Sequence, residues 1–215
     1  LAGDAIHDWE NPTQAIGDMI HAGGPVLAYV ADVSRNVYKP LQQDGIDLDT
    51  FSNYLLFDRI LNDPTLRGKF APGGMTEIQA REFMDRTKAQ MGAAKFLRLD
   101  DHASTFQKIR QDHVIEPFVT ARLYGDVVNN KLRDNAHYAT FDHVSHAEQT
   151  MGHGSGAYIH SYFGSVSPVG DPFSRTVYKD ITLIKAALRK QALASTVQFL
   201  QNHYGPAMVV QVRPV

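Results

Sequence analysis

Four of the ten histidines in this chain lie within eighteen residues, 143–160, which read HVSHAEQTMGHGSGAYIH. Imidazole nitrogens and carboxylate oxygens together are suitable ligands for zinc or a similar divalent ion. A metal held here would lower the pKa of a bound water and so supply the nucleophile of a hydrolase. The candidate ligands are His143, His146, Glu148 or Asp142, and His153 or His160.

The spacing of these histidines is not that of a known helical zinc motif. In HEXXH, two rings four residues apart on a helix point at one ion, and a glutamate lies between them. His143 and His146 are three residues apart, in HVSH, with no glutamate between them. The pattern therefore favours an exposed, polar, glycine-rich loop, and the metal-dependent hydrolase is the alternative reading.

Other catalytic patterns are incomplete. Ser155 lies in GHGSGA, but the nucleophile elbow G-x-S-x-G needs glycine where this chain has His153 and Ala157. The alternating glycines at 152, 154 and 156 are not followed by a Walker lysine. We therefore predict a hinge in this loop and no catalytic residue.

Three Asp-His dipeptides occur, at 101–102, 112–113 and 142–143. Neighbouring residues on a helix point about 100° apart, so the two members of a helical dipeptide cannot form an Asp–His relay with each other. We expect His102 and His113 to be partly buried or surface residues.

A basic helix face is the most informative candidate binding site. In the segment that follows Asp171 and Pro172, five cations fall on one arc of a helical wheel, opposite an apolar side made by Val177, Ile181, Ile184 and Leu188. Such a face can contact phosphates or an acidic partner. Its cations are Arg175, Lys179, Lys185, Arg189 and Lys190. Leu193, Val197 and Leu200 form a second apolar line, which predicts that the helix touches two neighbours.

Composition limits the class of protein. The chain has 215 residues, of which 43% are hydrophobic and 20% charged, and its net charge is −2. These values indicate a globular domain without a membrane span and give no overall attraction to nucleic acid. The absence of cysteine excludes disulfides and cysteine-based zinc sites.

The elements that must position these residues are mostly helices. Helical patterns cover 25–41, with an apolar stripe of Val26, Val30, Val33 and Val37, and 48–61, which ends before Pro64. Thr76 and Gln79 predict a capping box for a helix that ends at Gly92. A further pattern runs from 93 to about 132, with a break expected at Pro117. The last helix begins after Asp171 and ends before Gly205.

The remaining segments differ in character. YATFDHV (138–144) and AYIHSYF (157–163) predict short strands. The expected fold is thus mainly α, with long packed helices, a two- or three-stranded β element near 138–163 and an extended C-terminal tail. We expect one domain with three regions, a helical region 1–134, a β-hairpin-like His/Gly-rich connector 135–170, and a basic amphipathic helix with its tail at 171–215.

The order of features in the last 80 residues resembles a helical segment of the large polyvalent proteins of phages and mobile elements, which include proteins packaged in the virion and delivered with DNA. The resemblance rests on residues 138–141, on 154–164, and on 171–199, the long helix opened by DPF. No catalytic residue is attached to it. It implies a scaffold or interaction region within a longer polypeptide, in agreement with a start at Leu1 that looks like an internal cut.

The function expected from the resemblance is therefore that of a non-catalytic assembly module without a cofactor, an internal virion or DNA-ejection component. The expected partners are other protein subunits, through self-association or through other domains of the parent protein. Nucleic acid is a further expected partner of the basic face of 175–190. No signal peptide is recognisable, so the expected location is the virion or the bacterial cytoplasm.

Overall fold

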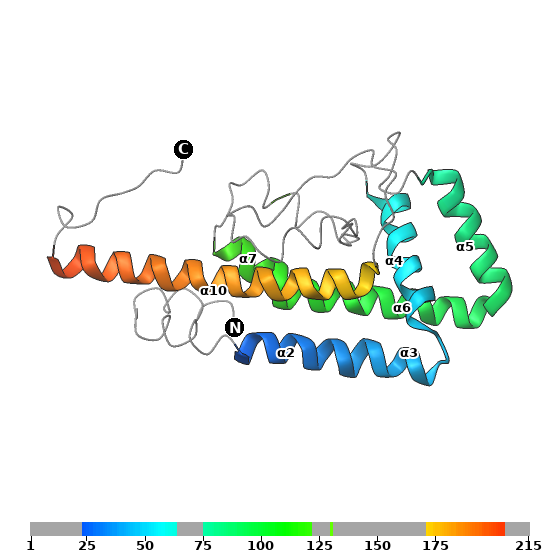
Figure 1. Cartoon of the computed structure of the whole chain (residues 1–215), viewed down its shortest axis with the longest axis horizontal. Helices are drawn as coiled ribbons and strands as arrows, with labels where there is room; N and C mark the ends of the chain where they lie inside the picture. Colours follow the sequence, from blue (N-terminus) through cyan, green and yellow to red (C-terminus); the bar gives the residue numbers. More distant parts are fainter. Residues whose placement is uncertain (1–22, 64–74, 122–129, 131–170, 205–215) are drawn as a thin grey trace.

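The computed structural model describes residues 23–63, 75–121, 130 and 171–204, and these residues form helices and no strand. The mainly helical class is thus confirmed. With the labels of Figure 1, the elements are α2 (Gly23–Val33), η2 (Ser34–Tyr38), α3 (Lys39–Gln43), α4 (Leu48–Asn62), α5 (Glu77–Met91), α6 (Ala93–Arg110), η5 (Gln111–Ile115), α7 (Glu116–Thr120) and α10 (Pro172–Tyr204). No described helix is both long and apolar enough to span a bilayer.

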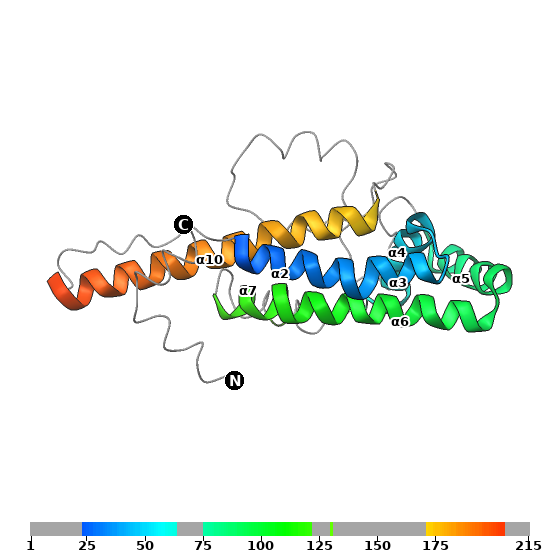
Figure 2. The same ribbon diagram turned by 90° about the horizontal axis from the view of Figure 1, so that it is seen from below.

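Three long rods run side by side. The first is α2–η2–α3, the second is α6–η5–α7, and the third is α10, while α4 and α5 lie together at one end (Figure 1). Seen from below, α2 lies between α10 and α6 (Figure 2). In both views α10 continues past the end of the other labelled helices, so its last turns project from the bundle.

Helix ends follow the sequence signals. The hydroxyl of Thr76 accepts from the Gln79 N–H at 3.2 Å, and the Gln79 side chain accepts from the Thr76 N–H at 2.8 Å, which confirms the capping box. Gly92 separates α5 from α6 with φ 80°, a value that favours glycine. Asp171 caps α10 by accepting from the backbone N–H of Phe173 and of Ser174.

Replacing Thr76 by alanine should lower the free energy of unfolding by about 1 kcal/mol, because the orphan N–H of Gln79 loses its acceptor. Chemical denaturation followed by circular dichroism measures the change. Ser104→Ala, at an exposed position inside α6, is the matched control and should change the stability by less than about 0.5 kcal/mol. Equal losses for the two variants would contradict a stabilising cap.

Two of the rods contain a π-helical segment followed closely by a proline. The Lys39 N–H bonds to the Ser34 carbonyl, and the Glu116 N–H bonds to the Gln111 carbonyl, each five residues back. Pro40 and Pro117 follow at once. The break predicted at Pro117 is therefore wrong, because the wider π turn accommodates a proline, which cannot donate to the carbonyl four residues before it.

The π segments also set which residues are buried. In the first rod the buried residues are Tyr29, Val33, Val37 and Leu41, at strict four-residue spacing. The second rod contains a line with the same spacing, Phe106, Arg110, Val114 and Phe118, and has further buried residues beside it, among them Ile109, Ile115 and Val119. A four-residue spacing drifts about 40° per step around a regular α-helix. A π turn takes up more residues per turn and so reduces the drift. The predicted valine stripe was wrong at Val30, which is 38% exposed, and Tyr29 takes its place.

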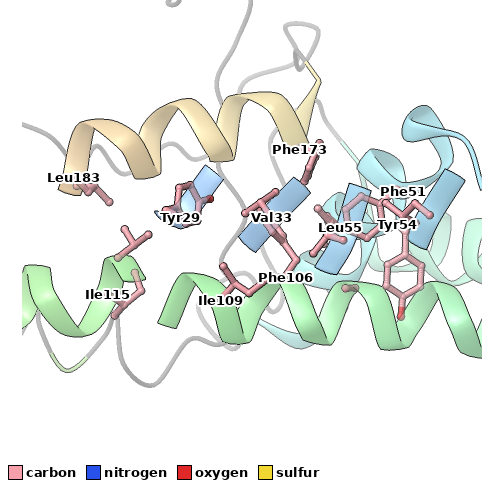
Figure 3. Packing of buried hydrophobic residues seen from close by; sticks show 14 of the residues in the cluster. Tyr29, Val33, Phe51, Tyr54, Leu55, Phe106, Ile109, Ile115, Phe173 and Leu183 are labelled. Carbon is pink, nitrogen blue, oxygen red and sulfur yellow. The ribbon is translucent and has the colours of Figure 1, made fainter. Parts of the chain in front are cut away.

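One apolar cluster joins the rods. Figure 3 shows Tyr29 and Val33 between α10 and α6, with Phe173 of α10 close to Phe106 of α6. Measured between ring centroids, Phe106 lies 5.1 Å from Phe173 and 6.2 Å from Phe51. Three rings from α4, α6 and α10 therefore meet in the core, and α10 is fixed to the bundle at its N-terminal half.

Several sequence predictions fall on residues that the structure does not describe. They are the β element near 138–163, the rest of the connector 135–170, the extended tail after 204, and the continuation of the second rod to about 132. These stay predictions.

Candidate interaction site

A buried polar cluster connects the three rods. Asp180 of α10 accepts from Arg110 through both carboxylate oxygens, at 2.6 Å from Nε and 2.9 Å from Nη2. It also accepts from the hydroxyl of Tyr29, at 2.7 Å. We call these three residues the anchor cluster. A two-pronged arginine–carboxylate pair fixes both position and orientation, so the anchor cluster holds α10 against α2 and α6 in one register.

The anchor cluster is closed to solvent. Tyr29 and Asp180 are 0% exposed and Arg110 is 3% exposed. Burial, and after it the negative charge of Asp180, raise the pKa of Tyr29 far above its ordinary value. The phenol therefore remains protonated and acts only as a donor. These groups resemble an acid–base site in type, but a substrate has no access to them, so we assign them a structural role.

The two described histidines of the Asp-His dipeptides pair with carboxylates on other elements. His102 lies 2.8 Å from Asp44, and His113 of η5 lies 2.9 Å from Asp32 of α2. Their side chains are 13% and 28% exposed, which confirms that they are partly buried. Among the described residues, no group of three or more histidines and carboxylates lies close enough to hold a metal ion.

The buried side of α10 differs from the predicted one. Of the four predicted apolar residues only Ile184 is fully buried, while Val177, Ile181 and Leu188 are partly exposed. In this half of α10 the most deeply buried positions are instead Thr176, Asp180, Leu183 and Ala187. Each of these positions comes one residue before a predicted one, so hydrophobicity alone misplaces the buried side of α10 by about 100° on the helical wheel, and two of the four buried residues are polar. The anchor cluster is the physical reason for the difference.

Because the buried side of α10 is rotated from the predicted one, the five predicted basic residues differ in exposure. Lys185, Arg189 and Lys190 are exposed, whereas Arg175 and Lys179 are only partly exposed because they lie nearer the core. The structure thus leaves three of the five cations freely accessible on one side of α10.

The exposed cations continue into exposed apolar residues. Leu193, Val197 and Leu200 are 55%, 39% and 38% exposed, and at about 100° per residue they fall on the same arc as Arg189. The predicted second neighbour of this line is not among the described helices. Ala192 and Ser195, on another side of these turns, are buried. We define the α10 outer face as Lys185, Arg189, Lys190, Leu193, Val197 and Leu200.

The charge on this face is uniform. The sequence from 181 to 204 contains no aspartate or glutamate. A surface with cations at one end and apolar side chains at the other suits a partner that has carboxylates beside a small apolar patch. It offers no general acid or base of its own, so the chemistry available here is recognition.

The alternative metal ligands His143, His146, Glu148 and His153 lie outside the described residues. Comparison of the chain with family models, with curated proteins and with solved structures gave no match.

Proposed function

We propose that this chain is a non-catalytic helical assembly module that binds a macromolecular partner through the α10 outer face. The observation that supports this proposal is that the N-terminal half of α10 is fixed in the bundle, whereas its C-terminal turns extend beyond the bundle. The buried Arg110–Asp180 pair fixes the N-terminal half, and the last turns project past the bundle (Figure 1). Exposed apolar side chains in these turns include Leu193, Val197 and Leu200.

The mixed character of the face favours a protein partner. Phosphate binding would use the cations but leave Leu193, Val197 and Leu200 without a role. Apolar side chains in line on a helix are typical of helix-to-helix contacts, where they bury area against a partner. The cations then set partner choice and orientation.

The resemblance to segments of large phage and mobile-element proteins extends this proposal. On that reading the module is an internal virion or DNA-ejection component of a longer polypeptide, and the partner is another subunit or another part of the parent protein. The support is the DPF-opened basic helix, whose start at Pro172 and end at Tyr204 match the predicted element.

A triple variant, Lys185→Glu, Arg189→Glu and Lys190→Glu, tests the proposal. We expect the wild-type chain to associate, seen in analytical ultracentrifugation as a mass that rises with concentration, and the variant to lose association. Retention on immobilised duplex DNA is measured in parallel, because cations alone can mediate it. If the variant equals the wild type in both assays, the outer face has no binding role and the proposal fails.

A further inference from the structure

We propose that the partner is a second copy of this chain, and that the α10 outer face of one copy packs antiparallel on the exposed face of α6 in the other. This inference rests on the proposed function, since it names the partner of the same surface. It is carried by two complementary patterns of charge and apolar residues on described, exposed positions.

The receiving face of α6 carries the opposite charge. Leu97 is 61% exposed, and Asp101 follows it on the same side and is exposed as well. Asp100, also exposed, lies at the edge of this side, where its carboxylate accepts from the hydroxyl of Tyr54 in α4. Ala93 lies one turn before Leu97 and is exposed as well. An isolated exposed leucine needs no explanation. Here, however, it lies between a small residue and two carboxylates, which is the reverse of the order on α10.

The spacing of the two faces matches. When two antiparallel helices place Leu193 opposite Leu97, equal steps along each helix keep residues opposite, because both rise about 1.5 Å per residue. Arg189, four residues before Leu193, then meets Asp101, four residues after Leu97. By the same steps Lys190 meets Asp100, and Val197 meets Ala93. One register thus satisfies two ion pairs and two apolar contacts.

Two other exposed faces, on α10 and α5, match less well. Two α10 outer faces packed on each other would bring cations together with no carboxylate, because residues 181–204 contain none. The exposed side of α5 has Ile78, 70% exposed, with Glu82 one turn on. With Ile78 opposite Leu193, however, Lys190 would meet Arg81 and Lys185 would meet Arg86. Like charges in direct opposition disfavour this docking, so α6 is a better receiver than α5 or a second α10 outer face.

Complementary single variants test the pairing in the full chain. Arg189→Glu should weaken self-association at least about tenfold, because the introduced carboxylate would face Asp101 of the other copy. Asp101→Arg should do the same, because the introduced guanidinium would face Arg189. When a copy with Arg189→Glu meets a copy with Asp101→Arg, the two altered side chains carry opposite charges and can form an ion pair again. The mixture should therefore associate with about the wild-type dissociation constant.

Sedimentation velocity at several concentrations measures the association, with melting temperature recorded for each variant. Arg86→Glu is the matched control, since it makes the same charge change on an exposed residue of α5 and should leave association unchanged. Leu193→Ser removes the central apolar contact without changing charge and should also weaken association, while its exposed position should leave the melting temperature unaffected.

The outcomes separate this inference from the proposed function. Weak association of each variant alone with recovery in the mixture supports docking on α6. Association that is equally weak in the mixture overturns it. A wild-type chain that is monomeric but retains duplex DNA through Lys185, Arg189 and Lys190 also overturns it, while the binding role of the outer face survives. A wild-type chain that neither associates nor binds DNA overturns both.

Discussion

Asp180→Ala should lower the free energy of unfolding by about 3–5 kcal/mol, the largest effect we expect from a single charged residue. The substitution removes the carboxylate that pairs with the buried guanidinium of Arg110 through two hydrogen bonds, and removing one partner of a buried ion pair is strongly destabilising. It also removes the acceptor of the Tyr29 hydroxyl. Denaturation by urea, monitored by circular dichroism, gives the value.

Three further variants test whether the buried charge of Arg110 causes the loss of stability in Asp180→Ala. Tyr29→Phe removes one hydrogen bond and should cost about 1 kcal/mol. The double variant Arg110→Met, Asp180→Leu removes both charges and should cost clearly less than the sum of Arg110→Met and Asp180→Ala. Glu77→Gln breaks an exposed pair with Arg81 and should change stability by less than about 1 kcal/mol. An Asp180→Ala loss no larger than that of Glu77→Gln would refute the anchoring role.

Phe106→Ala should cost about 3–5 kcal/mol, since it removes a buried ring and leaves a cavity. The ring is 1% exposed and lies 5.1 Å from Phe173 and 6.2 Å from Phe51, measured between centroids. Because those neighbours come from α10 and α4, the loss loosens the contact between three helices. Thermal or urea unfolding measures the effect.

Two variants serve as comparisons for Phe106→Ala. One keeps most of the side-chain volume at position 106, and the other alters an exposed residue of the same helix. Phe106→Leu keeps most of the volume and should cost less than about 1.5 kcal/mol. Leu97→Ala, on the same helix but 61% exposed, should stay within about 0.5 kcal/mol of the wild type at low protein concentration. If Phe106→Ala resembles Leu97→Ala, the aromatic cluster is not the centre of the core.

Local signals in the sequence predicted helix ends well. Thr76 and Gln79, Gly92, and Asp171 with Pro172 each act through the backbone within a few residues, so their effect can be read without knowing the fold. The helical class also followed from the periodicity of apolar residues.

The partners of polar residues could not be predicted in the same way. Asp180 lies 70 residues from Arg110 and 151 from Tyr29, and nothing local indicates that these three meet. A signal was present in hindsight, since Asp180 is the last acidic residue of a helix that is otherwise apolar and basic. A lone carboxylate in such a setting is a candidate for a buried ion pair, but whether it is buried, and with which partner, depends on packing.

The candidate site was found in part. The cations at Lys185, Arg189 and Lys190 were predicted and are exposed, while the apolar continuation at Leu193, Val197 and Leu200 was expected to be covered by a neighbour. Sequence periodicity shows that residues share a side of a helix. It does not show where that helix leaves the bundle.

The prolines after the two π segments have a consequence for alignment. If either rod were regular, Pro40 and Pro117 would leave the carbonyls of Asn36 and His113 without an amide donor and would collide with them. In the second rod, a change to an unbroken α-helix would turn the buried residues after the π segment relative to Arg110, which lies before it and pairs with Asp180. The two prolines thus favour the wider turns at η2 and η5 over an unbroken α-helix.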